Sequence, residues 1–201
     1  MEDRCSTLLS ERPQYWAQVW PSAVAAGARL LDDPALVANK RVLELGAGLG
    51  LASVCAALAG ATTVLATDRE PDSARYVIAN AAENGVTVST APLDWTLDWT
   101  SQMDESSYDV VLAADVVYDE SAPPLLARLL RSAVAPGGKV LLVDAEDRPY
   151  NSDRRMALLQ LLCEERGAEF EVAQSTRSHV ALKTRQGDGF EIVECVLQRR
   201  T

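Results

Sequence analysis

Lysine is scarce in this sequence, although basic residues as a class are not. Of the 19 basic residues only three are lysines, and the 29 acidic residues bring the formal net charge to −10. Tight, sequence-independent binding to nucleic acid requires a basic surface that displaces counterions from the phosphates. The charge balance therefore argues against a nucleic-acid partner and favours a basic protein partner, which an acidic surface attracts.

Paired cysteines, long apolar runs and a secretory leader are missing as well. The four cysteines lie far apart without a C-x-x-C pair, which argues against a zinc or dithiol redox site and fits a reducing compartment. The longest nearly apolar run, residues 50–61, is too short to cross a bilayer, and the first residues lack a signal-peptide pattern. We expect a monomeric cytoplasmic protein without a metal or a membrane partner, while a mitochondrial or nuclear location stays open.

Short strand-like runs alternate with helical ones through most of the chain. The predicted strands are residues 41–45, 63–67, 86–91, 108–114, 139–144, 169–175 and 190–197, and the predicted helices are residues 20–31, 51–59, 71–84, 124–135 and 152–166. This alternation predicts a parallel sheet with helices on both faces, and the last two strands predict an antiparallel pair at one edge. The expected fold is a Rossmann-like, mostly parallel α/β sheet of seven strands in a single domain, residues 1–201. A helical segment at 1–40 precedes the core at 41–201.

Turn and capping residues set the predicted limits of several elements. The P-G-G run at 136–138 predicts a turn into the fifth strand, and either Ser152 or Asp153 is expected to cap the helix that follows. His179, the single histidine, is expected on the surface, in the hairpin between the last two strands.

The strongest chemical motif is the run E-L-G-A-G-L-G at residues 44–50, which follows the first predicted strand and opens a helix. Glycines let the backbone turn sharply and approach a ligand closely, and the first N–H groups of a helix are free to bind one. In open parallel sheets, ligands bind at the carboxyl ends of the strands, where the strand order reverses. We therefore expect a ligand site here, with a plain tight turn as the alternative; the residues concerned are Glu44, Gly46, Gly48 and Gly50.

Asp68 ends the second predicted strand, 24 positions after Glu44. An acidic side chain at that point can accept hydrogen bonds from the hydroxyls of a ribose, whereas the alternative is a helix cap ahead of Pro71. NAD-binding proteins use the same device, but their fingerprint is G-x-G-x-x-G/A. Here Leu51 occupies the position of the third glycine, so the spacing disfavours a dinucleotide.

Two further polar motifs follow the third and fourth predicted strands. Asp94 and Trp95 suit an adenine, because the carboxylate can accept from the amino group while the indole covers the ring. A surface turn is the alternative, and the repeat of the motif at 98–99 leaves the register open. Asp115 lies where a carboxylate can meet both a cofactor and an incoming nucleophile, three residues before Tyr118. Their alternatives are a turn aspartate and a packed tyrosine.

In this order the motifs resemble those of the seven-strand methyltransferases that use S-adenosylmethionine. The D-x-x-Y motif after the fourth strand and Trp20, just before the core, resemble more narrowly the family whose characterised members mostly methylate lysine side chains of non-histone proteins. The run Y-W-A-x-x-W-P at 15–21 and the D-R-P run at 147–149 resemble most the branch that methylates the electron-transfer flavoprotein β subunit.

The resemblance implies a set of contacts to S-adenosylmethionine and its product S-adenosylhomocysteine. The glycine loop and Glu44 surround the methionine part, and Asp68 holds the ribose. Asp94 and Trp95 meet the adenine, while Trp20 closes over the cofactor.

The resemblance also implies a transfer site at the end of the fourth strand, lined by Ala114 and Asp115. A lysine amine has a reference pKa near 10.4 and must lose its proton before it attacks. Asp115 is expected to hold the incoming ammonium and Tyr118 to orient or desolvate it, so these two residues are the predicted catalytic pair. No metal is needed for this reaction.

Three other functions stay open on the sequence alone. In the first, an enzyme of the same fold methylates arginine or a small molecule. The second is an NAD-dependent dehydrogenase, which the glycine spacing disfavours. The third is a non-catalytic module that retains the fold and binds a partner.

Overall fold

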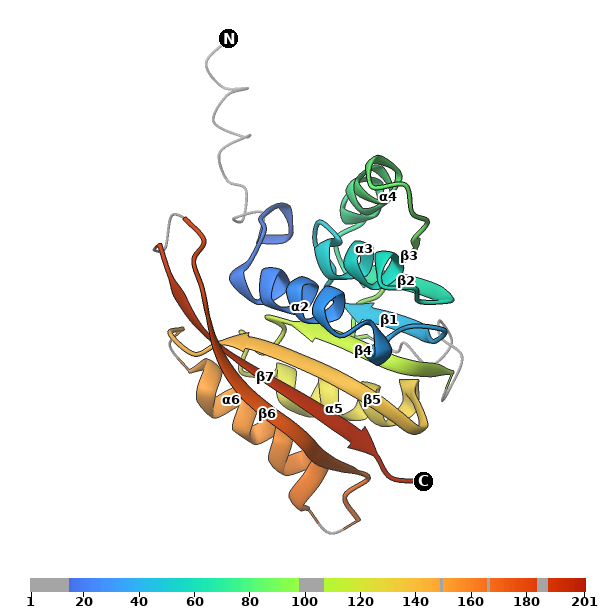
Figure 1. The fold of residues 1–201 in the computed structure, drawn as a ribbon. Coiled ribbons are helices and arrows are strands. Elements are labelled where there is room, and N and C mark those ends of the chain that lie inside the picture. The colour runs from blue at the N-terminus through green and yellow to red at the C-terminus, as the bar shows by residue number, and fades with distance from the viewer. Residues whose placement is uncertain (1–14, 98–106, 149, 166, 184–187) are drawn as a thin grey trace.

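The computed structural model describes residues 15–97, 107–148, 150–165, 167–183 and 188–201. These residues form a sheet of seven strands in the order β3-β2-β1-β4-β5-β7-β6 (Figure 1). The strands are β1 (Arg41–Leu45), β2 (Thr63–Asp68), β3 (Ser89–Pro92), β4 (Tyr108–Ala114), β5 (Val134–Ala145), β6 (Phe170–Val180) and β7 (Phe190–Arg199). Strands β1 to β5 pair in parallel, and β7 runs antiparallel to both β5 and β6. The predicted fold class is confirmed.

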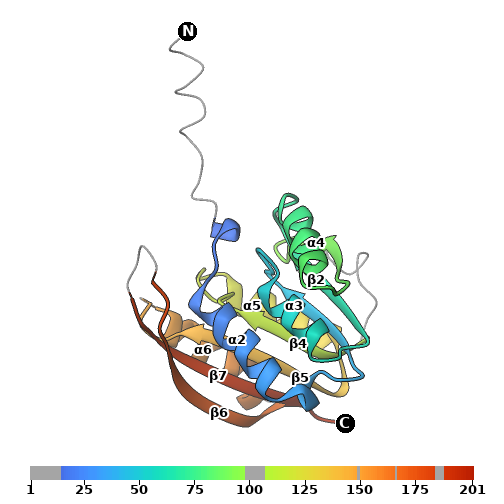
Figure 2. The same ribbon diagram turned by 45° about the horizontal axis from the view of Figure 1, so that its top comes forward.

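Helices cover both faces of this sheet. They are α2 (Pro21–Asp32), α3 (Leu51–Leu58), α4 (Ser73–Glu83), α5 (Ala122–Ala133) and α6 (Asn151–Leu159). Figure 2 shows α2, α3 and α4 on one face and α5 and α6 on the other. None of the helices in the described part of the chain is long and apolar enough to cross a membrane.

Strand β4 shows how the sequence builds the two layers of the core. Its side chains point alternately to the two faces of the sheet, as the period of a strand requires. Val110 and Leu112 pack with the side chains under α2, α3 and α4, whereas Val111 and Ala113 pack with those under α5 and α6. A strand buried on both faces has a nearly continuous apolar sequence, and for that reason its predicted limits, 108–114, match the structure.

Several predicted limits are wrong; the third strand, for example, begins at Ser89 and not at residue 86. Strand β5 begins at Val134, where Val134 pairs with Tyr108, and the register then jumps so that Lys139 faces Val110. The P-G-G run is therefore an irregularity within the strand pairing. Helix α6 begins at Asn151, and its N-cap is Tyr150 in a left-handed conformation without a side-chain cap; neither Ser152 nor Asp153 caps it.

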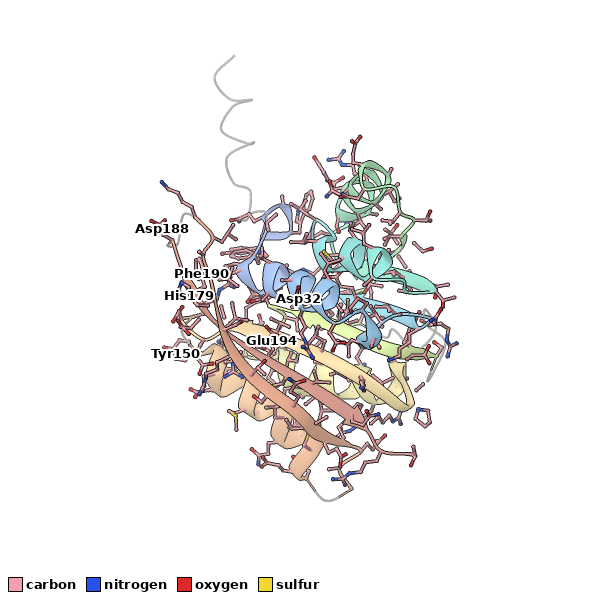
Figure 3. All side chains as sticks on the ribbon, in the orientation of Figure 1. Asp32, Tyr150, His179, Asp188, Phe190 and Glu194 are labelled. Atoms are coloured by element: carbon pink, nitrogen blue, oxygen red, sulfur yellow. The ribbon has the colours of Figure 1, made fainter. Side chains whose placement is uncertain are left out.

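Strands β6 and β7 form a hairpin longer than predicted. His179 lies within β6, in register with Glu191 of β7, and its Nδ1 is 3.0 Å from a Glu191 carboxylate oxygen. The histidine is exposed, as expected, but it belongs to the strand and not to the connecting loop. Figure 3 shows His179 and Phe190 on the same part of this hairpin.

Strand order reverses between β1 and β4, which are neighbours in the sheet although they are far apart in the sequence. Helix α3 leaves the end of β1 on one face, and α5 follows β4 on the other. The connections therefore diverge at this point and leave an opening at the carboxyl ends of the two strands, where open α/β sheets bind ligands.

Candidate functional site

A cavity of about 1330 Å³ opens at the carboxyl ends of the parallel strands. Its lining includes every predicted site residue except Gly50, namely Trp20, Glu44, Gly46, Gly48, Asp68, Asp94, Trp95, Ala114, Asp115 and Tyr118. The sheet thus brings together side chains that lie almost a hundred positions apart in the sequence. A cavity of this size can hold a cofactor and part of a substrate side by side.

Two glycines of the loop after β1 are required for different reasons. Both have positive φ, 52° at Gly48 and 78° at Gly50, a conformation that other residues rarely adopt. A Cβ on Gly48 would lie 2.9 Å from the carbonyl oxygen of Trp16, and one on Gly50 would lie 2.8 Å from the Val77 side chain. Gly48 therefore lets the N-terminal segment approach the loop at the cavity, whereas Gly50 lets α3 pack against α4.

Glu44, in β1, is a buried carboxylate that fixes the start of α3. Its Oε2 accepts a hydrogen bond from the Ser53 backbone N–H at 2.9 Å and another from the Ser53 hydroxyl. Burial raises the pKa of Glu44 to about 7, the two bonds from Ser53 oppose that shift, and the charge of Asp68 adds to it. Through its bonds to Ser53, Glu44 ties the start of α3 to β1.

Asp68 ties the end of β2 to the glycine loop. Its Oδ2 accepts from the Gly48 N–H at 2.8 Å and its Oδ1 accepts from the Glu70 N–H at 2.9 Å. Helix α4 begins at Ser73 with Asp72 as its N-cap residue, so Asp68 does not cap that helix. A carboxylate offers about four acceptor positions, which leaves Asp68 able to accept further bonds from a ligand in the cavity.

Asp94 and Trp95 follow β3 and also line the cavity. Oδ1 of Asp94 accepts from the backbone N–H and the hydroxyl of Thr96, at 2.9 and 2.6 Å, and these bonds hold the pKa of Asp94 below its usual range. A Cβ added to Gly46 would lie 3.5 Å from the Trp95 indole, which therefore lies beside the glycine loop. The repeat of this motif at 98–99 lies outside the described residues.

Asp115 leaves the end of β4 in a strained conformation. Its φ is +61°, in the left-handed region that few non-glycine residues adopt, and its N–H donates to the Val143 carbonyl oxygen at 2.8 Å. The side chain is 3% exposed and forms an ion pair with Arg148 at 2.7 Å. Burial raises the pKa of Asp115 to about 6, against the opposing effects of Arg148 and Asn151. Strain of this kind concentrates at functional sites.

Tyr118 and Trp20 also line the cavity. Tyr118 is 46% exposed, so it is not a packed core residue, and its backbone carbonyl accepts a hydrogen bond from Arg154. The Trp20 indole N–H donates to the Tyr15 carbonyl oxygen at 2.9 Å, and the Arg148 guanidinium lies 4.3 Å from the Trp20 ring centroid. The Tyr118 ring is thus available to a ligand, whereas the Trp20 ring is already in contact with Arg148.

Three site residues were not identified as such from the sequence. Arg148 and Asn151 follow β5 and line the cavity beside Asp115, and Phe190 reaches it from the start of β7. The D-R-P run was noted only for its resemblance, because nothing local to the sequence shows that it meets the end of β4. The local signal for Arg148 is its place three positions after the end of a buried strand.

Asp144 is a buried carboxylate below the site, in β5. Neither of its oxygens has a hydrogen-bond partner among the described residues, and burial together with the charge of Asp115 raises its pKa to about 8. The folded protein therefore keeps a proton on Asp144 at neutral pH. In the unfolded chain, where the pKa of this carboxyl has its ordinary value of 3.8, that proton has been released. Because the folded state binds more protons, stability falls as the pH rises from about 4 to 8.

Asp144→Asn is expected to stabilise the protein at pH 8. The neutral amide replaces a carboxyl group that must stay protonated or be buried as an unpaired charge, a cost of roughly 1–3 kcal/mol. Chemical denaturation at pH 5 and pH 8 checks this, with the gain expected mainly at pH 8. A variant less stable than the wild type at pH 8 would show that Asp144 is ionised and paired.

The fold is shared with many solved methyltransferases. One is the ribosomal protein L11 methylase of Lactobacillus delbrueckii subsp. bulgaricus, with a TM-score of 0.59, 21% identity and coverage of 89% of this chain and 77% of that one. Another is TYW2 of P. horikoshii, solved in complex with MeSAdo, with a TM-score of 0.65, 16% identity and coverage of 92% and 65%. At such identities the likeness shows the fold alone.

Sequence comparison is more specific. The family model described as lysine methyltransferase matches residues 11–161. The electron transfer flavoprotein beta subunit lysine methyltransferase of Xenopus laevis is 31% identical over 81% of this chain and 63% of its own length. Protein N-lysine methyltransferase METTL21A of Danio rerio is 36% identical over 69% of this chain and 64% of its own. The chain thus spans less than two thirds of the length of these curated relatives.

Proposed function

The chain belongs to the lysine methyltransferase family, and from this membership we propose that it transfers a methyl group from S-adenosylmethionine to a lysine side chain of another protein. The observation that carries the proposal is the position of Asp115. This carboxylate is the predicted amine-binding group, and it lies buried in the wall of the cavity that the glycine loop opens.

The size of the cavity and the hydrogen-bond acceptors in its lining support S-adenosylmethionine as the ligand. The Gly48 backbone approaches Trp16 so closely that a side chain at Gly48 would clash, which gives the loop the tight form that a ligand-binding turn needs. Carboxylates at three strand ends suit a ligand with a ribose, an adenine amino group and a positive charge; these are Asp68, Asp94 and Asp115. When bound, S-adenosylmethionine supplies a methyl group already activated by its sulfonium.

The protein's own part in the reaction is to bind and orient the amine and to exclude water. Asp115 accepts a hydrogen bond from the lysine nitrogen after the ammonium has lost its proton to water. Tyr118, which is half-exposed at the cavity wall, flanks the aliphatic part of the side chain. Trp20, held by the Tyr15 carbonyl oxygen, covers the cofactor side of the cavity.

Calorimetric titration is expected to show binding of S-adenosylhomocysteine and no comparable binding of NAD. The physical reason is the loop, because Leu51 stands where the dinucleotide fingerprint requires a third glycine, at the first residue of α3. Tighter binding of NAD would contradict the proposed cofactor.

Further properties of the substrate and of the protein belong to the proposal. The substrate is a basic protein, since the enzyme carries a net charge of −10, and the electron-transfer flavoprotein β subunit is the first candidate because relatives are named for it. The enzyme acts as a monomer in the cytoplasm and takes no nucleic acid as substrate.

Transfer of label from S-adenosylmethionine to proteins of a homologous cell extract tests the substrate class. Proteins of the intact extract are expected to accept the label, whereas an extract whose lysine amines have been chemically blocked is expected to accept none. Equal labelling of both extracts would favour arginine instead, and label found only on small molecules would contradict a protein substrate.

A further inference from the structure

Arg148 connects two segments that the proposed function treats separately. It follows β5, and its Nη2 lies 2.7 Å from Oδ2 of Asp115, at the end of β4. The same guanidinium lies over the ring of Trp20, the N-cap residue of α2, at 4.3 Å from the ring centroid. Its side chain is only 20% exposed. A planar guanidinium suits this double contact, because it can pair with a carboxylate while it stacks on an aromatic ring.

Ionisable side chains from several elements surround Asp115. Asp144 in β5 is protonated at neutral pH, because burial raises its pKa to about 8. Glu146, after β5, pairs with Arg155 of α6 at 2.7 Å. Further along the cavity lie the ionisable residues Glu44, Asp68, Arg69, Glu70, Asp72, Asp94, Tyr118, Asp119 and Asp147.

Asp144 and Glu146 therefore carry no unmatched negative charge. Asp144 is neutral and Glu146 is matched by Arg155, so the charge of Asp115 itself is cancelled by Arg148. An amine that reaches Asp115 therefore meets a good hydrogen-bond acceptor whose negative charge is cancelled by Arg148.

This balance matters because the form of lysine that attacks is the free amine. An unpaired carboxylate beside an ammonium stabilises the charged form, whereas a nearby cation disfavours it. Asp115 alone would bind lysine in its unreactive form. With Arg148 beside it, the carboxylate can still accept an N–H hydrogen bond after the ammonium has released its proton to water.

We propose that Arg148 is a positioning residue for methyl transfer, which holds Asp115 in place and cancels its charge so that the substrate lysine occupies the site as the free amine. This inference rests on the proposed function. Through its contact with Trp20, the same side chain also fixes the N-terminal segment against the site.

The pH dependence of transfer by Arg148→Gln tests the inference. The neutral variant is expected to need a pH about one unit higher to reach half its maximal kcat, as typical effects of a neighbouring charge suggest. Its rate should be about tenfold lower at pH 7 and should recover in alkaline solution, and its KM for the protein substrate should fall. Arg148→Lys keeps the charge and is expected to keep the wild-type pH profile.

Arg75→Gln is the matched control. Arg75 also pairs with an aspartate, Asp72, at 3.5 Å and also lies over an aromatic ring, that of Tyr76, at 5.0 Å. It does not line the cavity, so its variant is expected to keep the wild-type rate and profile.

A second readout does not depend on activity. The carboxyl pKa of Asp115, followed by NMR, is expected to rise in Arg148→Gln, because Arg148 is the largest influence that lowers it. If the pKa of Asp115 does not change in Arg148→Gln, the inference is overturned and the proposed function stays intact. The same is true if the wild type is active and Arg148→Gln keeps its pH profile. The same holds if Arg148→Lys shifts the profile as far as Arg148→Gln. A wild type that methylates no protein would overturn both.

Discussion

Asp115→Asn is expected to reduce the rate of methyl transfer at least about 100-fold, the lower range for loss of a positioned polar catalytic group. The amide keeps the size of the side chain but loses the charge that pairs with Arg148 and one of the two acceptor oxygens of the carboxylate. Asparagine also tolerates the left-handed conformation at this position. The loss is therefore expected in a folded protein.

Asp115→Ala should abolish transfer almost completely, since it leaves no acceptor and a guanidinium without its partner. The comparison to make is transfer rate beside affinity for S-adenosylhomocysteine, and most of that affinity is expected to survive in both variants. Tyr118→Phe separates ring from hydroxyl, and a small effect would assign Tyr118 to shaping the channel. A wild-type rate in Asp115→Ala would remove Asp115 from the amine site, and equal losses of rate and affinity would place it with the cofactor alone.

Asp68→Ala is expected to weaken binding of S-adenosylhomocysteine by roughly 1.5–3 kcal/mol, the usual range for hydrogen bonds to a charged group. The structure adds a reason to the ribose contact expected from the sequence. Asp68 also accepts the Gly48 N–H, so its removal releases the loop as well as the ligand. Isothermal titration of the folded variant measures the change.

Asp109→Ala is the control for Asp68. Asp109, in β4, also accepts a backbone hydrogen bond, from the N–H of Arg41 at 2.8 Å. It lies near the amino end of its strand, away from the cavity at the carboxyl ends. Its loss should leave ligand affinity unchanged. If Asp68→Ala also binds with the wild-type affinity, Asp68 serves only to hold the loop, and the ribose is bound elsewhere.

The elements best predicted from the sequence are those whose pattern is local. Strand β4 is a continuous apolar run that a polar residue ends, and the loop after β1 has its glycines at positions of positive φ. These features need no knowledge of distant residues. Asp68 was expected from the sequence to hold a ribose, and the structure places its carboxylate beside the glycine loop, where it accepts the Gly48 N–H.

What the sequence did not predict depends on pairing across the sheet. Val134 joins β5 because Tyr108 offers it a parallel partner, which overrides the turn signal of the P-G-G run. Arg148 reaches Asp115 because β4 and β5 are parallel neighbours, so that their carboxyl ends lie side by side. Gly50, grouped with the loop by its spacing, is instead required by the Val77 side chain of α4. Tertiary contacts of this kind leave no local pattern.

The position of the transferred methyl group tests the central claim most directly. The purified chain is incubated with a homologous cell extract and S-adenosylmethionine that carries an isotopically labelled methyl group, and labelled peptides are located by mass spectrometry. We expect the label on the ε-nitrogen of a lysine in a basic protein, and its absence when Asp115→Asn replaces the wild type. Label confined to arginine or to small molecules, or no label above the Asp115→Asn background, would contradict the account.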